Sequence, residues 1–65
     1  MRCTINGEAV ELEACTVADL LIARGLAGKR VAVECNGAIV PRSRHGETWL
    51  AAGDVLEIVV AVGGG

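Results

Sequence analysis

The sequence VLEIVVAVGGG, at residues 55–65, decides how the rest of this chain is interpreted. Its first eight residues are mostly β-branched and apolar, which favours a β-strand because such side chains pack well on a pleated sheet. The run then changes to three glycines, which lose more conformational entropy on ordering than any other residue. We therefore predict a folded domain over residues 1–62 and a flexible glycine tail over residues 63–65.

Alternation along this last strand separates its side chains into two faces. The core face is expected to carry Leu56, Ile58 and Val60. Glu57 marks the solvent face, because an unpaired buried carboxylate is costly. We expect Val59 and Ala61, with Val62 at the root of the tail, to form a binding surface for partner proteins. The alternative is that these residues are ordinary apolar surface, which small sheets expose without binding any partner.

Composition restricts the possible classes of function. The chain has 65 residues, 52% of them hydrophobic, so we expect one small folded domain with little room for an enzyme pocket. Its net charge is −2 and it has a single aromatic residue, which disfavours a nucleic-acid surface of cations and stacking rings. With no apolar run long enough to span a bilayer and no signal-peptide pattern, we expect a cytoplasmic protein with no membrane partner.

The three cysteines, Cys3, Cys15 and Cys35, are odd in number and widely separated. This spacing fits neither a disulfide framework nor a metal site built from close cysteine pairs, so no metal ligands are predicted. Cys3 and Cys35 are expected to be buried as small apolar side chains. Cys15 precedes a predicted helix and is expected to be the most exposed of the three.

The first half of the chain predicts a hairpin followed by a helix. Alternating residues over 1–6 and again over 10–13 indicate two strands, and Asn6-Gly7 between them is typical of a two-residue turn. Thr16 and Asp19 match a capping box, so a helix is expected from there to about Arg24. Gly25 is expected to end that helix in the left-handed conformation.

The second half predicts three more strands. Residues 31–36 alternate, Asn36-Gly37 repeats the turn signal, and residues 38–40 form a brief strand that Pro41 confines to an edge. Residues 41–48 are expected to be a polar, solvated loop that contains Arg42, Arg44 and His45. Trp49 and Leu50 are expected to return toward the core before Gly53-Asp54 leads into the last strand.

This order of elements predicts an α+β fold of the ubiquitin-like β-grasp type. The sheet is expected to be small and mixed, with four to five strands and one crossing helix. The first and last strands are expected to be parallel neighbours, because the helix can supply the crossover between them.

Three segments resemble the ThiS family of sulfur carrier proteins of thiamine biosynthesis. They are Asn36 with Ile39-Val40-Pro41-Arg42, then Gly53-Asp54 with Glu57-Ile58-Val59, then Val62-Gly63-Gly64-Gly65. The resemblance covers essentially the whole chain. The glycine end is shared with molybdopterin carriers and ubiquitin-like modifiers, whereas the other two segments are more specific. Many family members have a tryptophan shortly after Val-Pro-Arg, where this chain has His45.

The resemblance implies a carrier rather than an enzyme. A ThiF-type adenylyltransferase would use ATP to convert the Gly65 carboxylate to an acyl-adenylate, while the carrier itself binds no cofactor. A persulfide from a donor such as a cysteine desulfurase would then convert Gly65 to a thiocarboxylate. A ThiG-type thiazole synthase would accept the sulfur. Gly63 and Gly64 would pass through the narrow entrance of each partner's active site.

Several alternatives share parts of this pattern. A molybdopterin-type carrier has the same tail chemistry with another acceptor, and a ubiquitin-like modifier would be conjugated to lysines. A β-grasp module that only binds is a third class, but a ferredoxin needs four clustered cysteines and an RNA-binding module needs positive charge. The glycines are also compatible with an idle terminus.

Overall fold

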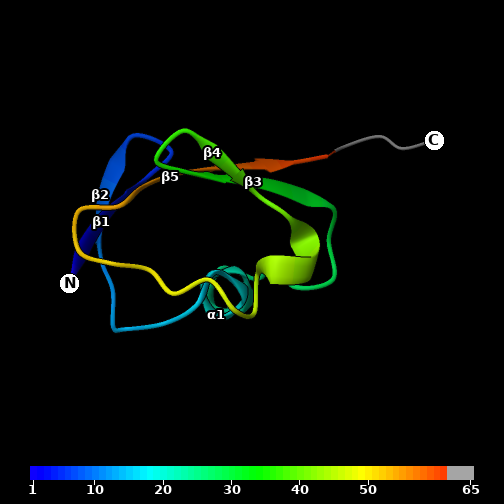
Figure 1. Cartoon of the computed structure of the whole chain (residues 1–65), viewed down its shortest axis with the longest axis horizontal. Coiled ribbons are helices and arrows are strands. Elements are labelled where there is room, and N and C mark those ends of the chain that lie inside the picture. Colours follow the sequence, from blue (N-terminus) through cyan, green and yellow to red (C-terminus); the bar gives the residue numbers. More distant parts are fainter. Residues whose placement is uncertain (62–65) are drawn as a thin grey trace.

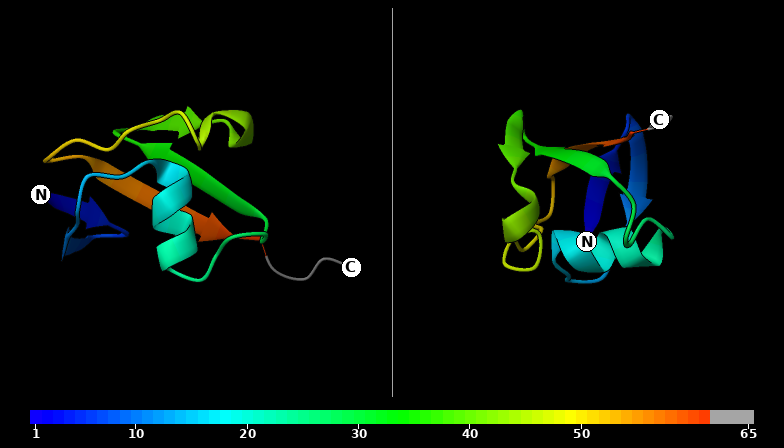
Figure 2. Two further views of the ribbon diagram at one scale, coloured as in Figure 1. Left: turned by 90° about the horizontal axis from the view of Figure 1, so that it is seen from below. Right: turned by 90° about the vertical axis from the view of Figure 1, so that its right-hand side faces the viewer.

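A computed structural model describes residues 1–61 of the chain. It contains the elements β1 (Arg2–Ile5), β2 (Glu8–Glu11), α1 (Val17–Ala23), β3 (Val31–Cys35), β4 (Ala38–Val40), the 3-10 helix η1 (Arg42–Arg44) and β5 (Val55–Val60). The five strands form one sheet in the order β2-β1-β5-β3-β4. Helix α1 crosses one face of this sheet (Figures 1 and 2). The predicted β-grasp arrangement is confirmed.

Strand β5 lies in the centre of the sheet, although it is the last strand in the sequence. It pairs in parallel with β1 over two residue pairs and antiparallel with β3 over five, from Val31↔Val60 to Cys35↔Leu56. The predicted parallel neighbours are therefore correct. The short strand β4 lies at an edge, as expected for a strand that precedes Pro41.

Both predicted two-residue turns are present. Asn6 and Gly7 have φ values of 52° and 83°, and Asn36 and Gly37 have 52° and 84°. Positive φ at both central residues matches the right-handed twist of the paired strands, and asparagine and glycine tolerate it best. These turns set the registers of the β1–β2 and β3–β4 hairpins.

Helix α1 begins and ends as its sequence predicts. The Asp19 N–H donates to Thr16 Oγ1 (3.2 Å), and the Thr16 N–H donates to Asp19 Oδ2 (3.1 Å), which completes the capping box. At the other end Gly25 has a φ of 72°, and the Leu26 N–H donates to the Leu21 carbonyl (2.8 Å). A seven-residue helix gains most of its stability from packing onto the sheet.

The core lies between α1 and the sheet. It contains Cys3, Ile5, Val17, Leu20, Leu21, Val33, Leu50, Leu56 and Ile58. Of the residues predicted for the core face of β5, Leu56 and Ile58 are buried in this core, whereas Val60 is only half-buried. Among the described residues, no helix is long and apolar enough to cross a membrane.

Three expectations about side-chain burial are wrong. Trp49 does not return to the core but remains 65% exposed, while its neighbour Leu50 is buried. His45 is only 7% exposed, although it was expected to lie in a solvated loop. Cys35 is half-buried rather than buried, because it lies in the last pair of β3, next to the turn. Alternation predicts the face of a residue but not how far the neighbouring segments cover it.

Candidate functional site

The end of β5 presents an exposed apolar face on the side of the sheet away from α1. Burial alternates along the strand, and Val59 on the solvent face is 62% exposed. Val59 lies opposite Ala32 of β3, which is also exposed. Ala61 is exposed next to them. The structure therefore brings together Val59 and Ala61 as expected, whereas Val62, Gly63, Gly64 and Gly65 lie outside the described residues.

Strand β5 is held from both sides up to this face. On one side the Ala61 N–H donates to the Arg30 carbonyl (2.9 Å), which extends the pairing with β3. On the other side β1 ends at Ile5, but Asn6 continues the contact. Its Nδ2 donates to the Ile58 carbonyl (3.2 Å), and its Oδ1 accepts from the Ile58 N–H (2.8 Å). One side chain thus replaces a missing backbone pair.

A second asparagine holds the beginning of β5. The Val55 N–H donates to Asn36 Oδ1 (2.9 Å), and Asn36 Nδ2 donates to Asp54 Oδ1 (3.0 Å). The Ala51 N–H donates to Asp54 Oδ2 (2.8 Å), and this hydrogen bond, together with that from Asn36, lowers the pKa of the Asp54 carboxyl. Both turn asparagines therefore bind the central strand, a role that the turn signal alone does not reveal.

Two adjoining depressions lie next to the end of β5, and we call them together the basic groove. The first has a volume of about 270 Å³ and is lined by Arg30, Val31, Ala32, Arg42, Val59 and Ala61. The second has a volume of about 310 Å³ and extends beneath α1, where apolar side chains such as Leu21 and Leu26 line it with Lys29 and His45. The two depressions share Val31 and Arg42.

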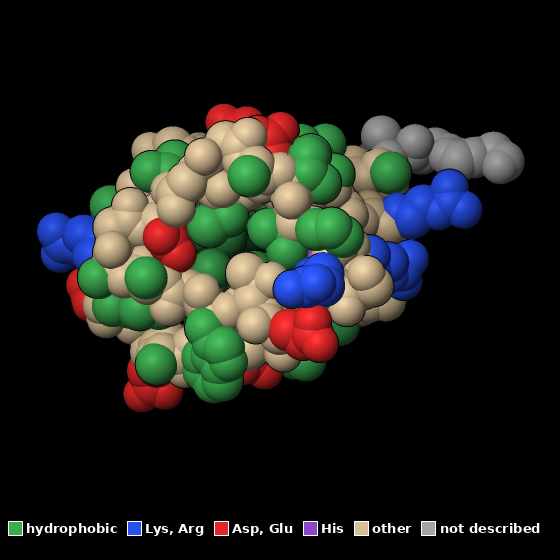
Figure 3. All heavy atoms as spheres, in the orientation of Figure 1, with side chains coloured by type: hydrophobic (Ala, Val, Ile, Leu, Met, Phe, Trp, Pro, Cys, Tyr) green, Lys and Arg blue, Asp and Glu red, His purple; other side chains and the backbone are tan. Residues whose placement is uncertain are grey.

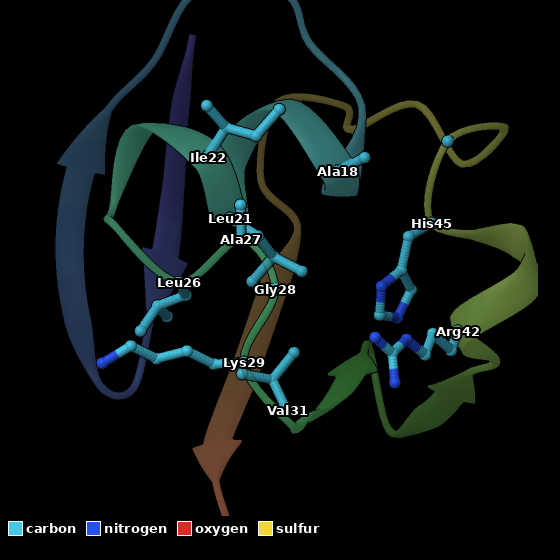
Figure 4. A pocket seen from close by; sticks show the side chains of 11 residues that line it. Ala18, Leu21, Ile22, Leu26, Ala27, Gly28, Lys29, Val31, Arg42 and His45 are labelled. Carbon is cyan, nitrogen blue, oxygen red and sulfur yellow. The ribbon is translucent and has the colours of Figure 1, made fainter.

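His45 fixes the loop that forms one wall of the basic groove. Its Nε2 lies 3.1 Å from the Val40 carbonyl, so this nitrogen carries the proton and donates. The His45 carbonyl accepts from the Ala18 N–H (3.0 Å) at the start of α1. Figure 4 shows the His45 ring and the Arg42 side chain on the same side of the depression. This histidine is a structural residue of the loop, and no sequence signal indicated it.

The cysteines do not form a reactive centre in the described structure. Cys3 is buried in the core, while Cys15 and Cys35 are half-buried. Burial and the nearby Asp19 carboxylate raise the pKa of the Cys15 thiol, and burial and Asp54 raise that of Cys35. A raised pKa leaves less thiolate at neutral pH and makes a thiol less reactive. Within residues 1–61, no three His, Cys, Asp or Glu side chains lie close enough to hold a metal ion.

Comparisons with known proteins agree with the fold. The model of the ThiS family matches residues 3–65. The sulfur carrier protein ThiS of Bacillus subtilis is 41% identical over 63 residues, which cover 94% of this chain and 96% of that protein. A crystal structure of the thiamine biosynthesis protein ThiS from Geobacter metallireducens superposes with a TM-score of 0.84 at 33% identity, covering 100% of both chains.

Longer relatives also match. A thiazole synthase of Paramagnetospirillum magneticum is 44% identical over 66 residues, and one of Magnetococcus marinus is 41% identical over the same length. Each match covers 100% of this chain but 20% of the relative. The chain therefore spans about one fifth of the length of these thiazole synthases.

Proposed function

This chain belongs to the ThiS family, and we propose on that premise that it carries sulfur for thiamine biosynthesis as a thiocarboxylate on Gly65. The observation that carries the proposal is the family match, which runs through Gly65 and includes a sulfur carrier protein of nearly equal length. The proposed role is that of a protein substrate, not of an enzyme.

The proposed chemistry begins with activation, because a carboxylate is a poor acyl electrophile. An oxygen of the Gly65 carboxylate attacks the α-phosphate of ATP in a ThiF-type adenylyltransferase, and pyrophosphate leaves. The terminal sulfur of a persulfide, supplied by a donor such as a cysteine desulfurase, then attacks the acyl carbon and expels AMP. Cleavage of the resulting S–S bond by a thiol leaves the sulfur on Gly65. The thiocarboxylate then donates this sulfur to the forming thiazole.

The described structure supports this division of roles. Strand β5 is the central strand and is bound by β3 on one side and by β1 and Asn6 on the other. Val59 and Ala61 are exposed immediately before residues 62–65, where a partner that receives Gly65 has to contact the domain. We propose these two residues, with Val62, as the docking surface, and Gly63 and Gly64 as the segment that enters the partner's active site.

The acceptor is proposed to be a ThiG-type thiazole synthase. The support is that two thiazole synthases contain a stretch similar to the whole of this chain. A carrier-like stretch within the same polypeptide as the acceptor enzyme would raise the effective concentration of the sulfur donor.

The experiment is intact-mass measurement of the chain after incubation with ATP, the adenylyltransferase, the desulfurase and its cysteine substrate. A mass gain equal to the replacement of one oxygen by one sulfur is expected, and a variant that lacks Gly65 should not gain it. Fragmentation should place the added sulfur on the last residue. An unchanged mass with partners that modify another ThiS protein in a parallel reaction would refute the proposal.

A further inference from the structure

We propose that the basic groove binds an acidic segment of the adenylyltransferase, one that also carries an apolar side chain. This inference rests on the proposed function and adds to it a second contact besides the apolar surface of Val59 and Ala61. The argument depends on where the unpaired cations lie, on the walls of the groove and on its distance from Gly65.

The positive charge of this acidic protein is concentrated in the groove. The chain has six Lys and Arg residues against eight Asp and Glu, and three of the six, Lys29, Arg30 and Arg42, line the two depressions. No Asp or Glu lines either depression. Among residues 1–61, these three cations and Arg24 form no ion pair, whereas Arg2 pairs with Glu11 and Arg44 with Glu47.

The space-filling view shows the same distribution on one face of the molecule. Lys and Arg side chains gather at the end where β5 ends, while Asp and Glu side chains lie mainly elsewhere on this face (Figure 3). Complementary charge steers two proteins together and disfavours wrong partners. A surface of this sign at the end of β5 is therefore suited to an acidic partner.

The walls of the groove favour a peptide segment over a nucleotide. In the depression of about 310 Å³, apolar side chains such as Leu21 lie on one side together with Lys29, and Arg42 with His45 lies on the other (Figure 4). No Phe, Tyr or Trp lines either depression. The one aromatic ring there, the imidazole of His45, is only 7% exposed and is hydrogen-bonded to the Val40 carbonyl, so it offers a base little surface to stack on. A guanidinium next to an apolar wall instead matches a carboxylate followed or preceded by an apolar side chain.

The groove lies beside the point where an enzyme that receives Gly65 meets the domain. In the proposed function the adenylyltransferase is the first such enzyme and the one that binds the unmodified carrier, so we assign the groove to it. Ala61 lines the depression of about 270 Å³, and Gly65, where the family match ends, is the fourth residue after it. Four extended residues reach at most about 14 Å. An active site that holds Gly65 therefore lies within this distance of the groove, so the surface around its entrance contacts Arg30 and Arg42.

The test measures the dissociation constant between the carrier and the adenylyltransferase at low and high salt. We compare the wild type with R30Q, R42Q and R30Q/R42Q, and use R2Q as a control with the same loss of charge at an exposed ion pair remote from the groove. Each groove substitution should weaken binding about 2- to 5-fold, and the double substitution about 10-fold, in line with exposed ion pairs. The double variant should also lose most of the salt dependence, while R2Q binds like the wild type.

Three outcomes would overturn the proposal. The groove variants could bind as tightly as the wild type, R2Q could weaken binding as much as the double variant, or ATP alone could bind the isolated carrier in a manner that R42Q abolishes. The mass gained by the carrier at a saturating concentration of the enzymes tests the proposed function independently of the groove contact. If the wild type and the double variant are both fully converted but differ in dissociation constant, the proposed function and the proposed groove contact are both supported. If the wild type stays unmodified, the proposed function is refuted.

Discussion

Replacing Asn6 with glycine should test how β5 is held at its end. Glycine adopts the positive φ of this turn without strain, so N6G removes the amide while keeping the turn. The side chain makes two hydrogen bonds to the main chain of Ile58, of 3.2 Å and 2.8 Å, and both are partly buried. N36G is the matched control, because Asn36 has the same φ of 52° and its hydrogen bonds to Val55 and Asp54 are exposed.

The expected change in the free energy of unfolding follows from the number and burial of these hydrogen bonds. A hydrogen bond contributes about 0.5–1.5 kcal/mol net, so N6G should lower the free energy of unfolding by about 2 kcal/mol. N36G should cost about 1 kcal/mol less, because water replaces exposed hydrogen bonds more easily. In a domain of this length, 1 kcal/mol corresponds to about 4–8 °C in Tm, so N6G should lower Tm by about 8–16 °C.

Urea denaturation followed by circular dichroism measures both free energies under one condition. Amide hydrogen exchange of Ile58 gives a second, local readout, because its N–H donates to Asn6 directly. In N6G this amide should lose more protection than the core amides of the same variant. Equal costs for the two variants, or a cost for N6G below about 0.5 kcal/mol, would refute the conclusion that Asn6 replaces a missing backbone pair.

Three further predictions concern partners, pH and sulfur. V59D should weaken adenylyltransferase binding about 10-fold or more, as for the central residue of an interface. V55D, on the same face at the other end of β5, is the control and should leave binding unchanged. Both variants should keep the wild-type circular dichroism spectrum. The lowered pKa of Asp54 contributes stability above its unfolded value of about 3.8, and this stability is lost as the pH falls through the lower folded pKa. Urea midpoints of the wild type should therefore fall more steeply below about pH 4 than those of D54N, and parallel curves would contradict the assignment. Serine at both Cys15 and Cys35 should leave the mass gain on the carrier unchanged, and its loss would show that a thiol of this chain handles the sulfur.

Local sequence signals predicted the parts of the fold that depend on neighbouring residues. The Asn-Gly turns, the capping box of Thr16 with Asp19, and the glycine end of α1 all place their hydrogen bonds within a few residues. Alternation in β5 correctly separated Leu56 and Ile58 from Val59 because the strand is flanked by others on both sides. The resemblance to the ThiS family is likewise confirmed.

The parts that could not be predicted depend on contacts between distant segments. The Asn6 amide binds Ile58, 52 residues away, and a turn signal carries no information about this partner. His45 is buried because the loop after β4 folds against the start of α1, where its carbonyl accepts from Ala18. Arg42 is exposed, as the sequence predicts, but only the tertiary structure places it beside Arg30 and Val59.

In the proposed function, the side chains that distinguish one partner from another belong to the folded domain, because residues 63–65 are glycines. Glycine has no side chain and offers a partner only backbone groups. Discrimination between partners must therefore come from side chains of the domain that lie near the entrance of the active site that holds Gly65. In the described structure, those at the end of β5 are apolar Val59 and Ala61 next to cationic Arg30 and Arg42. In the proposed complexes, apolar contact would supply affinity and the charges would disfavour partners of the wrong sign. Substitutions at Val59 or Ala61 should therefore weaken binding at every salt concentration, whereas substitutions at Arg30 or Arg42 should also reduce its salt dependence.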